Sequence, residues 1–595
     1  NGILQIGNHN VLPIAGTLTT KLIGMFDLNG YNQEIGGLSG DGGSINNGGF
    51  ENNILSVNQA ADSTYSGLIN GNVTLLKNGA GRLTLTSANN YRGGTVFEGG
   101  VLSVSQESNL GYTSTAVRPD ALRFKGGTLE TTASMSLAVT SGITLDSAGG
   151  TIAPAASTAL TIESVVTGIG SLTKIDAGTL ILNNADNDYL GDTNIVAGSL
   201  VAGGAGHLAP ASRHIISGNA ASGTLDMNGF DQKVGSLATA GATPANANVV
   251  LGSNLLTVGS DNTMGAVYAG AITGSGIVRI DTLGAQTFAD ADNSGQTWVT
   301  EVARGQLSVA GTAKLGSGTV TLGISGVSGG NDRVVLDLQG ASVANDIVVT
   351  NVNSAGVSIL QATTAADSSL TGTLALGRDA FAGAVAGQTL ALDGSVSGTG
   401  RLTLVDGGTV ALNAANTFGT SVAGGSGSAI DGGTVIRYGT VEVGDSAGLG
   451  TKHVELGDVR TIMTTVIDRA TTASLTADGG DYNAAGGTAQ TGAFVGVAAT
   501  VDGNTYGVGD IGKTILVKNE EADATRNGIY TIVAVNGGTM DLVRASDFDP
   551  PREMTYGTQF TVANGSSANK SFFMTGPGSV DCCRPGSDPS RFREE

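Results

Sequence analysis

The chain has 595 residues, of which 95 are glycine, roughly one in six against a usual share of about 7%. Hydrophobic residues make up 40% of the chain, which argues against disorder, and 10 prolines without a strict Gly-X-Y period exclude collagen. The formal net charge of −21 at pH 7 argues against a nucleic-acid partner, because an acidic surface repels phosphate backbones.

The glycines also argue against a helical protein. They are spread through nearly every segment, and each costs about 1 kcal/mol in a helix relative to alanine, so strands joined by frequent turns are expected. No apolar run approaches the roughly 20 residues of a membrane-spanning helix. The sequence begins at Asn1 in mid-pattern without a signal peptide, and we interpret it as a mature or trimmed form for which secretion stays open.

A first motif repeats along the chain. It runs from Gly71 to Gly111 and recurs from Gly168 to Leu208. A decayed third copy spans Gly274 to Gly316, and a fourth spans Gly398 to Thr420 and closes with Tyr438 to Gly450. A second motif repeats as FDLNGYNQEIGGL and LDMNGFDQKVGSL, at 26–38 and 225–237. Recurring motifs of this length indicate a repeat array.

Each copy consists of short alternating runs, such as Arg82 to Thr86, separated by Gly-Gly, Asn-Asn or Gly-Thr. Alternation gives one buried and one exposed face, and glycine or asparagine accepts the positive φ of a corner. A lone coil cannot bury its own apolar face, so coils must stack about 4.8 Å apart. The sequence therefore predicts an all-β fold, a parallel β-solenoid over residues 1–455, on the order of 100 Å long at 20 to 25 residues per coil.

The second full copy of the first motif carries the pattern of a known family. Its positions are Leu172-Thr173-Lys174, Ala177 to Leu180, Asn187, Tyr189, Gly191, Thr193, Gly198 and Leu200. This pattern resembles the glycine-rich passenger repeats of bacterial autotransporters, and the resemblance covers roughly the first 455 residues. It implies a secreted, right-handed parallel β-helix with an adhesive, structural or sometimes enzymatic role.

The composition changes from about Leu475. We predict a linker at 456–474, a small antiparallel β module at 475–575 and a flexible tail at 576–595. The module resembles one found in phage tail proteins and large bacterial surface proteins, on Gly509-Asp510, Val517 to Asn519, Asn527 to Tyr530 and Arg544 to Asp549.

The two cysteines, Cys582 and Cys583, are adjacent and near the C-terminus. They cannot cross-link the body of the fold, and adjacency strains any bond between them. Avoidance of cysteine by a bacterial surface protein is one interpretation, and an intermolecular bridge is the alternative.

Two short motifs resemble calcium ligands. Asp290, Asp292 and Glu301 have the spacing of an EF-hand loop, but they coincide with the Asn-rich corner of the third repeat. Asp547 and Asp549 form a second candidate pair, which a turn with two solvated carboxylates explains equally well. We therefore expect no cofactor and no metal, with calcium at these residues as the alternative.

Other motifs do not support an enzyme. Residues 507–514 fit the phosphate-loop pattern, but the β-branched residues that follow predict a strand where that loop requires a helix. His9, His207, His214 and His453 share no ligand spacing, although His207 and His214 are near one another in sequence, and solvent-facing corners are expected for all four. No nucleophile elbow is present, and Trp298 and scattered tyrosines are the available sugar platforms. We predict no catalytic residues.

The sequence leads to one preferred function. We expect an extracellular structural or adhesive protein of the bacterial surface, an elongated solenoid that associates head-to-tail into filaments because its terminal strand edges need a partner. A receptor-binding or glycan-binding fibre is the alternative, and a polysaccharide-cleaving β-helix with paired carboxylates is the third reading. The expected partners are a second copy of the chain and a host surface, an abiotic surface or a glycan.

Overall fold

The computed structural model describes residues 2–450 except 325–332, 351–357, 420–432 and 438, and beyond residue 450 it describes strands only. Within this described part, every regular element is a β-strand apart from two 3-10 helices, η1 (Glu107–Leu110) and η2 (Pro244–Asn246). The prediction of an all-β fold is confirmed.

Residue contacts divide the chain into two units. The first unit comprises Asn1–Ile324 and Leu336–Ile347, and the second comprises Ser325–Val335 and Val348–Glu595. Strands β37 (Val334–Gln339) and β39 (Ile347–Val349) lie at the boundaries of these ranges. This division lies inside the range 1–455 expected as one solenoid, and the domain boundaries drawn from the sequence stay predictions.

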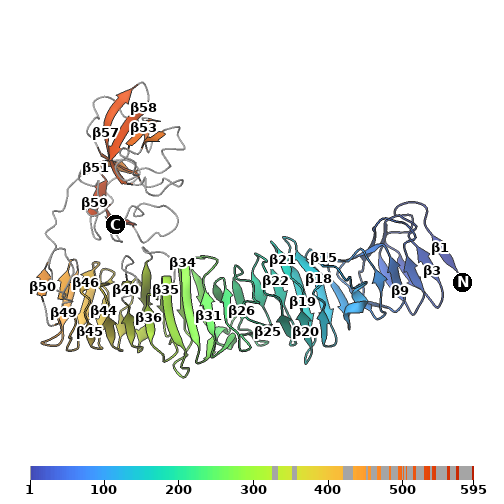
Figure 1. The fold of residues 1–595 in the computed structure, drawn as a ribbon, viewed down its shortest axis with the longest axis horizontal. Helices are drawn as coiled ribbons and strands as arrows, with labels where there is room; N and C mark the ends of the chain where they lie inside the picture. The colour runs from blue at the N-terminus through green and yellow to red at the C-terminus, as the bar shows by residue number, and fades with distance from the viewer. Residues whose placement is uncertain are drawn as a thin grey trace. The chain divides into compact units, whose positions relative to one another are not determined.

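The first unit is a parallel β-solenoid in which the strands inside each sheet pair with a strand of the coil before and a strand of the coil after (Figure 1). Two of its sheets consist of β1 (Ile3–Gln5), β3 (Met25–Asp27), β6 (Ser44–Asn46), β9 (Leu68–Gly71) and β12 (Asn90–Tyr91), and of β4 (Gln33–Ile35), β7 (Asn53–Asn58), β10 (Val73–Asn78), β13 (Thr95–Phe97), β15 (Arg118–Phe124), β18 (Ser141–Leu145) and β21 (Val166–Gly168).

A longer sheet runs beside them, and another covers the later coils. The longer sheet consists of β2 (Thr17–Thr20), β5 (Gly37–Gly40), β8 (Ser63–Tyr65), β11 (Arg82–Leu85), β14 (Val101–Val104), β16 (Thr128–Thr131), β19 (Gly150–Pro154), β22 (Leu172–Lys174), β24 (Thr193–Ile195), β26 (His214–Ser217) and β29 (Leu237–Ala240). The other consists of β17 (Met135–Leu137), β20 (Ala159–Ile162), β23 (Thr179–Leu182), β25 (Gly198–Ala202), β27 (Gly223–Asp226), β30 (Asn248–Gly252) and β33 (Ala271–Gly274).

The last coils of this unit contain its longest strands. These coils are formed by β28 (Gln232–Val234), β31 (Leu255–Val258), β32 (Ala266–Tyr268), β34 (Ile277–Ala289), β35 (Val299–Ala310), β36 (Val320–Leu322) and β38 (Ser342–Val343). Strands β34 and β35 pair in parallel over most of their length, with register shifts near Asp281.

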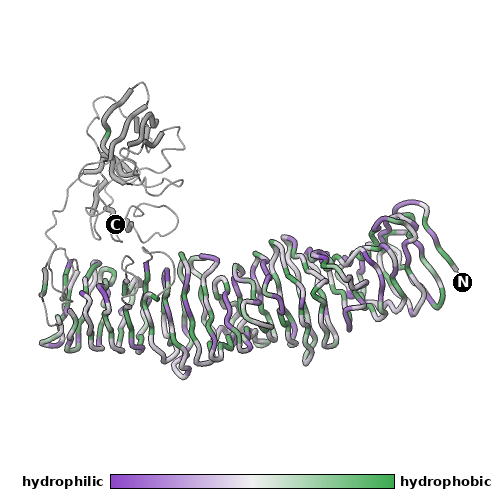
Figure 2. The backbone as a smooth tube through the Cα atoms, in the orientation of Figure 1, coloured by the Kyte–Doolittle hydropathy of each residue, from purple (hydrophilic) through white to green (hydrophobic). Residues whose placement is uncertain are grey.

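The pairing register confirms the predicted coil length and core. Leu180 of β23 pairs with Leu200 of β25, twenty positions on. Within a strand, buried and less buried residues alternate, as in β10, and equivalent buried residues stack from coil to coil, as Leu83, Leu102 and Leu129 do. Figure 2 shows this alternation of hydrophobic and hydrophilic residues along the coils. Like side chains therefore form internal ladders, as expected for parallel stacking.

The second motif forms an equivalent corner in both copies. Asn29 and Gly30 have φ of 47° and 87°, and Asn228 and Gly229 have φ of 51° and 85°. These are left-handed conformations that asparagine and glycine tolerate better than other residues. The motif repeats because the same tight corner recurs.

The second unit contains further parallel coils. They are formed by β40 (Ser358–Ala362), β43 (Ala380–Ala384), β46 (Leu402–Val405), β48 (Gly433–Ile436) and β50 (His453–Leu456), by β41 (Ser368–Leu370), β44 (Thr389–Leu392), β47 (Thr409–Leu412) and β49 (Thr440–Val443), and by the pair β42 (Leu374–Leu376) and β45 (Val396–Gly398).

The same unit ends in a mainly antiparallel sheet. Its order is β52 (Asp481–Asn483), β53 (Ala493–Ala498), β58 (Thr539–Arg544), β57 (Gly528–Asn536), β56 (Thr514–Val517), β51 (Val466–Ala470), β59 (Gln559–Val562), β60 (Ser571–Met574) and β61 (Phe592–Glu594), with a separate hairpin of β54 (Thr500–Val501) and β55 (Asn504–Thr505). Strand β51 pairs in parallel with β56 and β59, so the sheet is mixed. Strands β51 and β61 fall in the ranges expected for linker and tail.

Candidate functional site

The corners of the coils hold a recurring buried asparagine. The Oδ1 atom of Asn187 accepts a hydrogen bond from the Val166 amide at 2.8 Å, and its Nδ2 donates to the carbonyl oxygens of Asn184 and His207 at 2.8 Å each. The equivalent Oδ1 atoms accept from the preceding coil with almost the same geometry in the other copies, at Asn89, Asn293 and Asn416. One side chain thus joins three coils and satisfies their backbone groups.

The tryptophan and two of the repeat tyrosines, which the sequence offered as sugar platforms, lie in the core instead. Tyr91 and Tyr189 are buried, and each shares a hydrogen bond of 2.7 Å with a threonine hydroxyl, Thr95 or Thr193. Burial raises the pKa of both phenols, with the threonine bond opposing it. Trp298 is also fully buried. None of these rings can stack on an external sugar.

Two buried lysines recur at the same position of the first two copies. Lys77 Nζ donates to the carbonyl oxygens of Asn78, Gly79 and Gly99 at 2.7 to 3.1 Å. Lys174 Nζ donates to three equivalent carbonyls, those of Ile175, Asp176 and Ala197. Burial lowers the pKa of both ammonium groups to about 8, so they remain largely charged at neutral pH.

Their role was not predicted from the sequence. The signal was available, because the alternation in β22 places Lys174 on the same face as the buried Leu172. In the third and fourth copies the position holds Ile280 and Leu404, both buried. In the first two copies the lysine therefore links neighbouring coils through hydrogen bonds and does not serve as a reactive group.

The candidate calcium ligands of the third repeat have other partners. Asp292 Oδ1 accepts from the amide and hydroxyl of Ser294 at 3.0 and 2.6 Å. Glu301, in β35, forms an ion pair of 2.7 Å with Arg279 of the preceding coil. Asp290 lies at the end of β34 with φ of 53°, so strands rather than helices flank this loop.

Over the part of the chain that the structure describes, no group of three or more His, Cys, Asp or Glu side chains is placed to hold a metal ion. The other candidates, Asp547 and Asp549, lie outside the described residues, as do Cys582 and Cys583. The calcium sites drawn from the sequence stay untested predictions.

His9 is exposed, as expected, and His207 is partly buried, but one histidine is placed differently from the expectation. His214 lies in β26 and is fully buried, so the prediction of a solvent-facing corner is wrong for this residue. Its Nδ1 lies 2.9 Å from the Ser212 carbonyl oxygen, and its Nε2 has no hydrogen-bond partner. Desolvation lowers its pKa to about 4, which keeps the ring neutral. The strand alternation around His214 and Ile216 was the signal for burial.

The phosphate-loop match is followed by a strand. Residues 507–513 lie outside the described part, but β56 begins at Thr514, where a nucleotide site would need a helix. In the same sheet, β57 pairs in antiparallel fashion with β56 and with β58.

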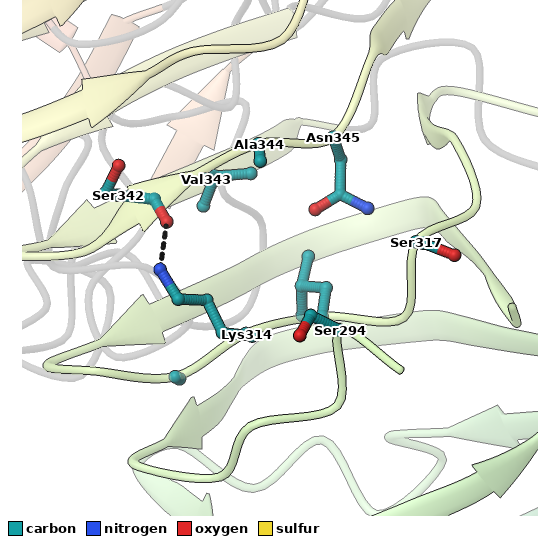
Figure 3. A pocket seen from close by; sticks show the side chains of 9 residues that line it. Ser294, Lys314, Ser317, Ser342, Val343, Ala344 and Asn345 are labelled. Atoms are coloured by element: carbon teal, nitrogen blue, oxygen red, sulfur yellow. Dashed lines mark hydrogen bonds between the residues drawn. The ribbon is translucent and has the colours of Figure 1, made fainter. Parts of the chain in front are cut away.

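A small hollow lies at the corners of the last coils of the first unit. Its cavity volume is about 110 Å³, and it lies between the segment 313–317 and the segment 342–345, with Ser294 at its edge (Figure 3). Lys314 Nζ donates across it to the Ser342 carbonyl oxygen at 3.4 Å. This hollow is not visible in the sequence, because its residues come from three different coils.

The repeats match a known family. A model of the passenger-associated-transport repeat matches residues 75–104 and 172–202. The chain contains passenger-associated-transport repeats. Each matched repeat includes the buried lysine, the corner asparagine and the tyrosine–threonine pair, at Lys77, Asn89, Tyr91 and Thr95 and at Lys174, Asn187, Tyr189 and Thr193.

A relative extends this similarity. Over 259 residues, 42% of this chain, the sequence is 37% identical to the protein named adhesin BmaC autotransporter from Brucella suis biovar 1 (strain 1330), and the match spans 7% of that adhesin's length. No solved structure matches the chain. The passenger repeats and this relative indicate a secreted protein of the cell surface. Within the described residues, no helix is long and apolar enough to cross a membrane.

Proposed function

We propose that this passenger-repeat chain is an adhesive and structural part of the bacterial surface, with a host or abiotic surface as its partner. The observation that supports this most is the 37% identity to an autotransporter adhesin across 259 residues. The repeat architecture is consistent with that role. Buried polar side chains such as Lys174 and Asn187 join neighbouring coils, which gives a stable scaffold that displays its outward side chains.

A non-enzymatic role is part of this proposal. Some acidic side chains on the coils pair with arginines of neighbouring coils, as Asp192 does with Arg213 at 2.6 Å and Asp281 with Arg304 at 2.9 Å. A glycosidase needs one carboxyl group free to donate a proton and another free to attack or to activate water. Carboxylates held in ion pairs suit stacking of coils rather than acid–base catalysis.

The adhesive role can be tested with the whole chain. Beads coated with the purified chain are expected to attach to epithelial monolayers and to matrix-coated glass more than beads coated with an unrelated β-solenoid of similar acidity. Soluble chain added in excess is expected to compete with this attachment. Attachment equal to that of the control beads on every surface would contradict the proposal.

We also propose head-to-tail self-association through β1. This strand forms the edge of its sheet and pairs with β3, and its Ile3 and Leu4 side chains are 64% and 47% exposed. An edge strand with exposed apolar side chains is a template for pairing with another chain.

The expected result in analytical ultracentrifugation is association that grows with concentration and weakens in Leu4→Pro, which removes an edge amide. Ile14→Pro serves as the control substitution, because Ile14 is exposed, lies outside the strands and is the second residue of the turn closed by the Gly16 amide and the Pro13 carbonyl, a position that proline suits. Monomers at all concentrations would contradict this association while leaving the adhesive role intact.

A further inference from the structure

The hollow between segments 313–317 and 342–345 combines an apolar floor with a polar rim. Leu315 and Val343 are each 3% exposed and form the floor. Ser294, Ser317 and Ser342 lie on the rim, together with Lys314 and Asn345 (Figure 3). A cavity of about 110 Å³ holds several water-sized spheres of about 10 to 15 Å³ each, so it accommodates one small ring but no extended chain.

The rim is held in place by hydrogen bonds behind it. Asn345 Nδ2 donates to the carbonyl oxygens of Gly316 and Gly318 at 2.5 and 2.7 Å, which leaves its Oδ1 as an acceptor on the side of the hollow toward Lys314 (Figure 3). Ser317 Oγ donates to the Gln296 carbonyl oxygen at 2.9 Å. These bonds fix the polar groups before any ligand arrives, which reduces the entropy lost on binding.

Lys314 supplies a positive charge at this rim in a chain of net charge −21. An ammonium group has three donors, and the bond to the Ser342 carbonyl at 3.4 Å is long and uses one of them. The carboxylate of Asp292 is near enough for its charge to act on Lys314, but no ion pair within 4 Å joins these two described residues, and its Oδ1 accepts from the amide and hydroxyl of Ser294. Lys314 therefore retains donors for an anionic group outside the protein.

The geometry points to this hollow as a binding site for a single carboxylated sugar residue, with the carboxylate paired to Lys314. Ring hydroxyls would bond to Asn345 Oδ1 and the serine hydroxyls, and the apolar face of the ring would pack on Leu315 and Val343. The inference rests on the proposed adhesive function and names a ligand class for it. Uronic acids of matrix polysaccharides and terminal sialic acids share this chemistry.

A charged sugar fits this site better than a neutral one. Sites for neutral sugars use an exposed aromatic ring as a platform. The floor here is aliphatic, and the nearby Trp298 is fully buried. Packing alone therefore contributes little affinity for a neutral sugar. The ion pair with Lys314 is the contact that can supply both affinity and choice of ligand.

Direct binding to the full chain tests the site. Calorimetric titrations with a hyaluronan tetrasaccharide, with sialyllactose and with lactose compare a uronate, a sialic acid and a neutral sugar. We expect binding of at least one carboxylated sugar and none of lactose. Lys314→Gln is expected to weaken that binding at least tenfold, and Ala344→Trp, at the exposed rim, to abolish it by filling the hollow.

Lys233→Gln, at an exposed lysine of β28 away from the hollow, is the charge-matched control and is expected to bind as the unchanged chain does. Thermal melting of each variant checks that it is folded. Equal binding of lactose and sialyllactose, no binding of either carboxylated sugar, or unchanged binding by folded Lys314→Gln would overturn the inference.

The bead assay separates this inference from the adhesive function. Adhesion by Lys314→Gln beads at the level of the unchanged chain would show that adhesion uses another surface. The hollow would then have no role in adhesion, while the proposed adhesive function would remain. Sugar binding by a chain that does not adhere would contradict the proposed adhesive function and leave the sugar-binding site.

Discussion

Asn187 illustrates how single side chains hold the coils together. Its amide makes hydrogen bonds with groups of three segments while being 2% exposed. A buried backbone amide or carbonyl that loses its partner costs about 1 to 3 kcal/mol. The corner asparagine therefore stabilises each coil by satisfying groups that the turn leaves outside the strand ladders.

Replacing Asn187 with alanine is expected to lower the free energy of unfolding of these coils by about 3 kcal/mol, because the Val166 amide and two carbonyls lose their partner. Hydrogen exchange of the Val166 amide measures the effect locally. Asn194→Ala is the control, since its Nδ2 makes a long bond of 3.4 Å near the surface and its loss is expected to cost under about 0.5 kcal/mol. Equal effects of the two substitutions would contradict this role.

His214 makes the stability of its coil depend on pH. Its pKa is lowered from 6.5 to about 4 because burial disfavours the charged ring, with the Ser212 carbonyl and the charges of Asp261 and Asp192 opposing this. The unfolded chain thus binds a proton at higher pH than the folded chain. The stability that comes from the neutral ring is complete above pH 6.5 and is lost as the pH falls toward 4.

The expected loss from pH 7 to pH 4 is up to about 3 kcal/mol, because a pKa shift of one unit corresponds to about 1.4 kcal/mol. Denaturant midpoints at several pH values measure it. His214→Leu keeps the site buried and is expected to flatten the curve between pH 6.5 and pH 4. An identical pH dependence in the two proteins would show that carboxylates alone cause the acid destabilisation.

At the scale of the element, some glycines at the corners of the coils cannot be replaced without cost. Gly198, at the start of β25, has φ of 66°, and a Cβ there would meet the main-chain oxygens of Gly178 and Asp176. Gly229 has a similar φ of 85° but open space around it. Alanine at Gly229 would therefore introduce conformational strain alone, whereas alanine at Gly198 would add a steric clash with the neighbouring coil.

We expect Gly198→Ala to destabilise the coil by more than about 2 kcal/mol and Gly229→Ala by about 1 kcal/mol, because the first adds a steric clash to the cost of a left-handed alanine. Thermal melting of both variants measures the difference. A larger effect at Gly229 would show that close packing between coils does not limit these corners.

Ion pairs between adjacent strands add a smaller contribution. Arg279 of β34 and Glu301 of β35 are 26% and 18% exposed in their side chains and lie 2.7 Å apart. A double-mutant cycle with Arg279→Gln and Glu301→Gln is expected to give a coupling of about 0.5 to 1 kcal/mol at low salt, reduced at 1 M salt. A coupling of zero at both salt concentrations would remove these pairs as a source of stability.

At the scale of the whole molecule, the net charge governs solubility. The chain carries −21 at pH 7 and has an isoelectric point of about 4.5. Repulsion between copies is therefore strong at neutral pH and disappears near pH 4.5. Light scattering is expected to show a solubility minimum near that pH in low salt, and a minimum above pH 6 would contradict this account.

Much of the fold was predictable because its determinants are local. Alternation in runs such as Arg82 to Thr86 and glycine at corners recur with the coil, so strands, parallel stacking and passenger repeats were visible in the chain. The position of Lys174 was also visible, since it shares a face with Leu172, but its three carbonyl partners were not. One of them belongs to Ala197, in the next coil.

The candidate calcium residues show the opposite case. Their spacing matches that of an EF-hand loop, which two helices flank. Here strands β34 and β35 flank the loop, and Glu301 pairs with Arg279. Sequence spacing describes neighbours along one turn. In a solenoid the neighbours of a side chain belong to other coils.

The sequence by itself determined the strand content, the coil length, the corners and the family of the repeats, because alternation and glycine placement act within a few residues. The tertiary structure decided which polar groups are buried with partners, that His214 lies in the core, and that Lys314 and Asn345 meet at one hollow. Those outcomes depend on the register in which coils stack, and that register brings together residues about twenty or more positions apart.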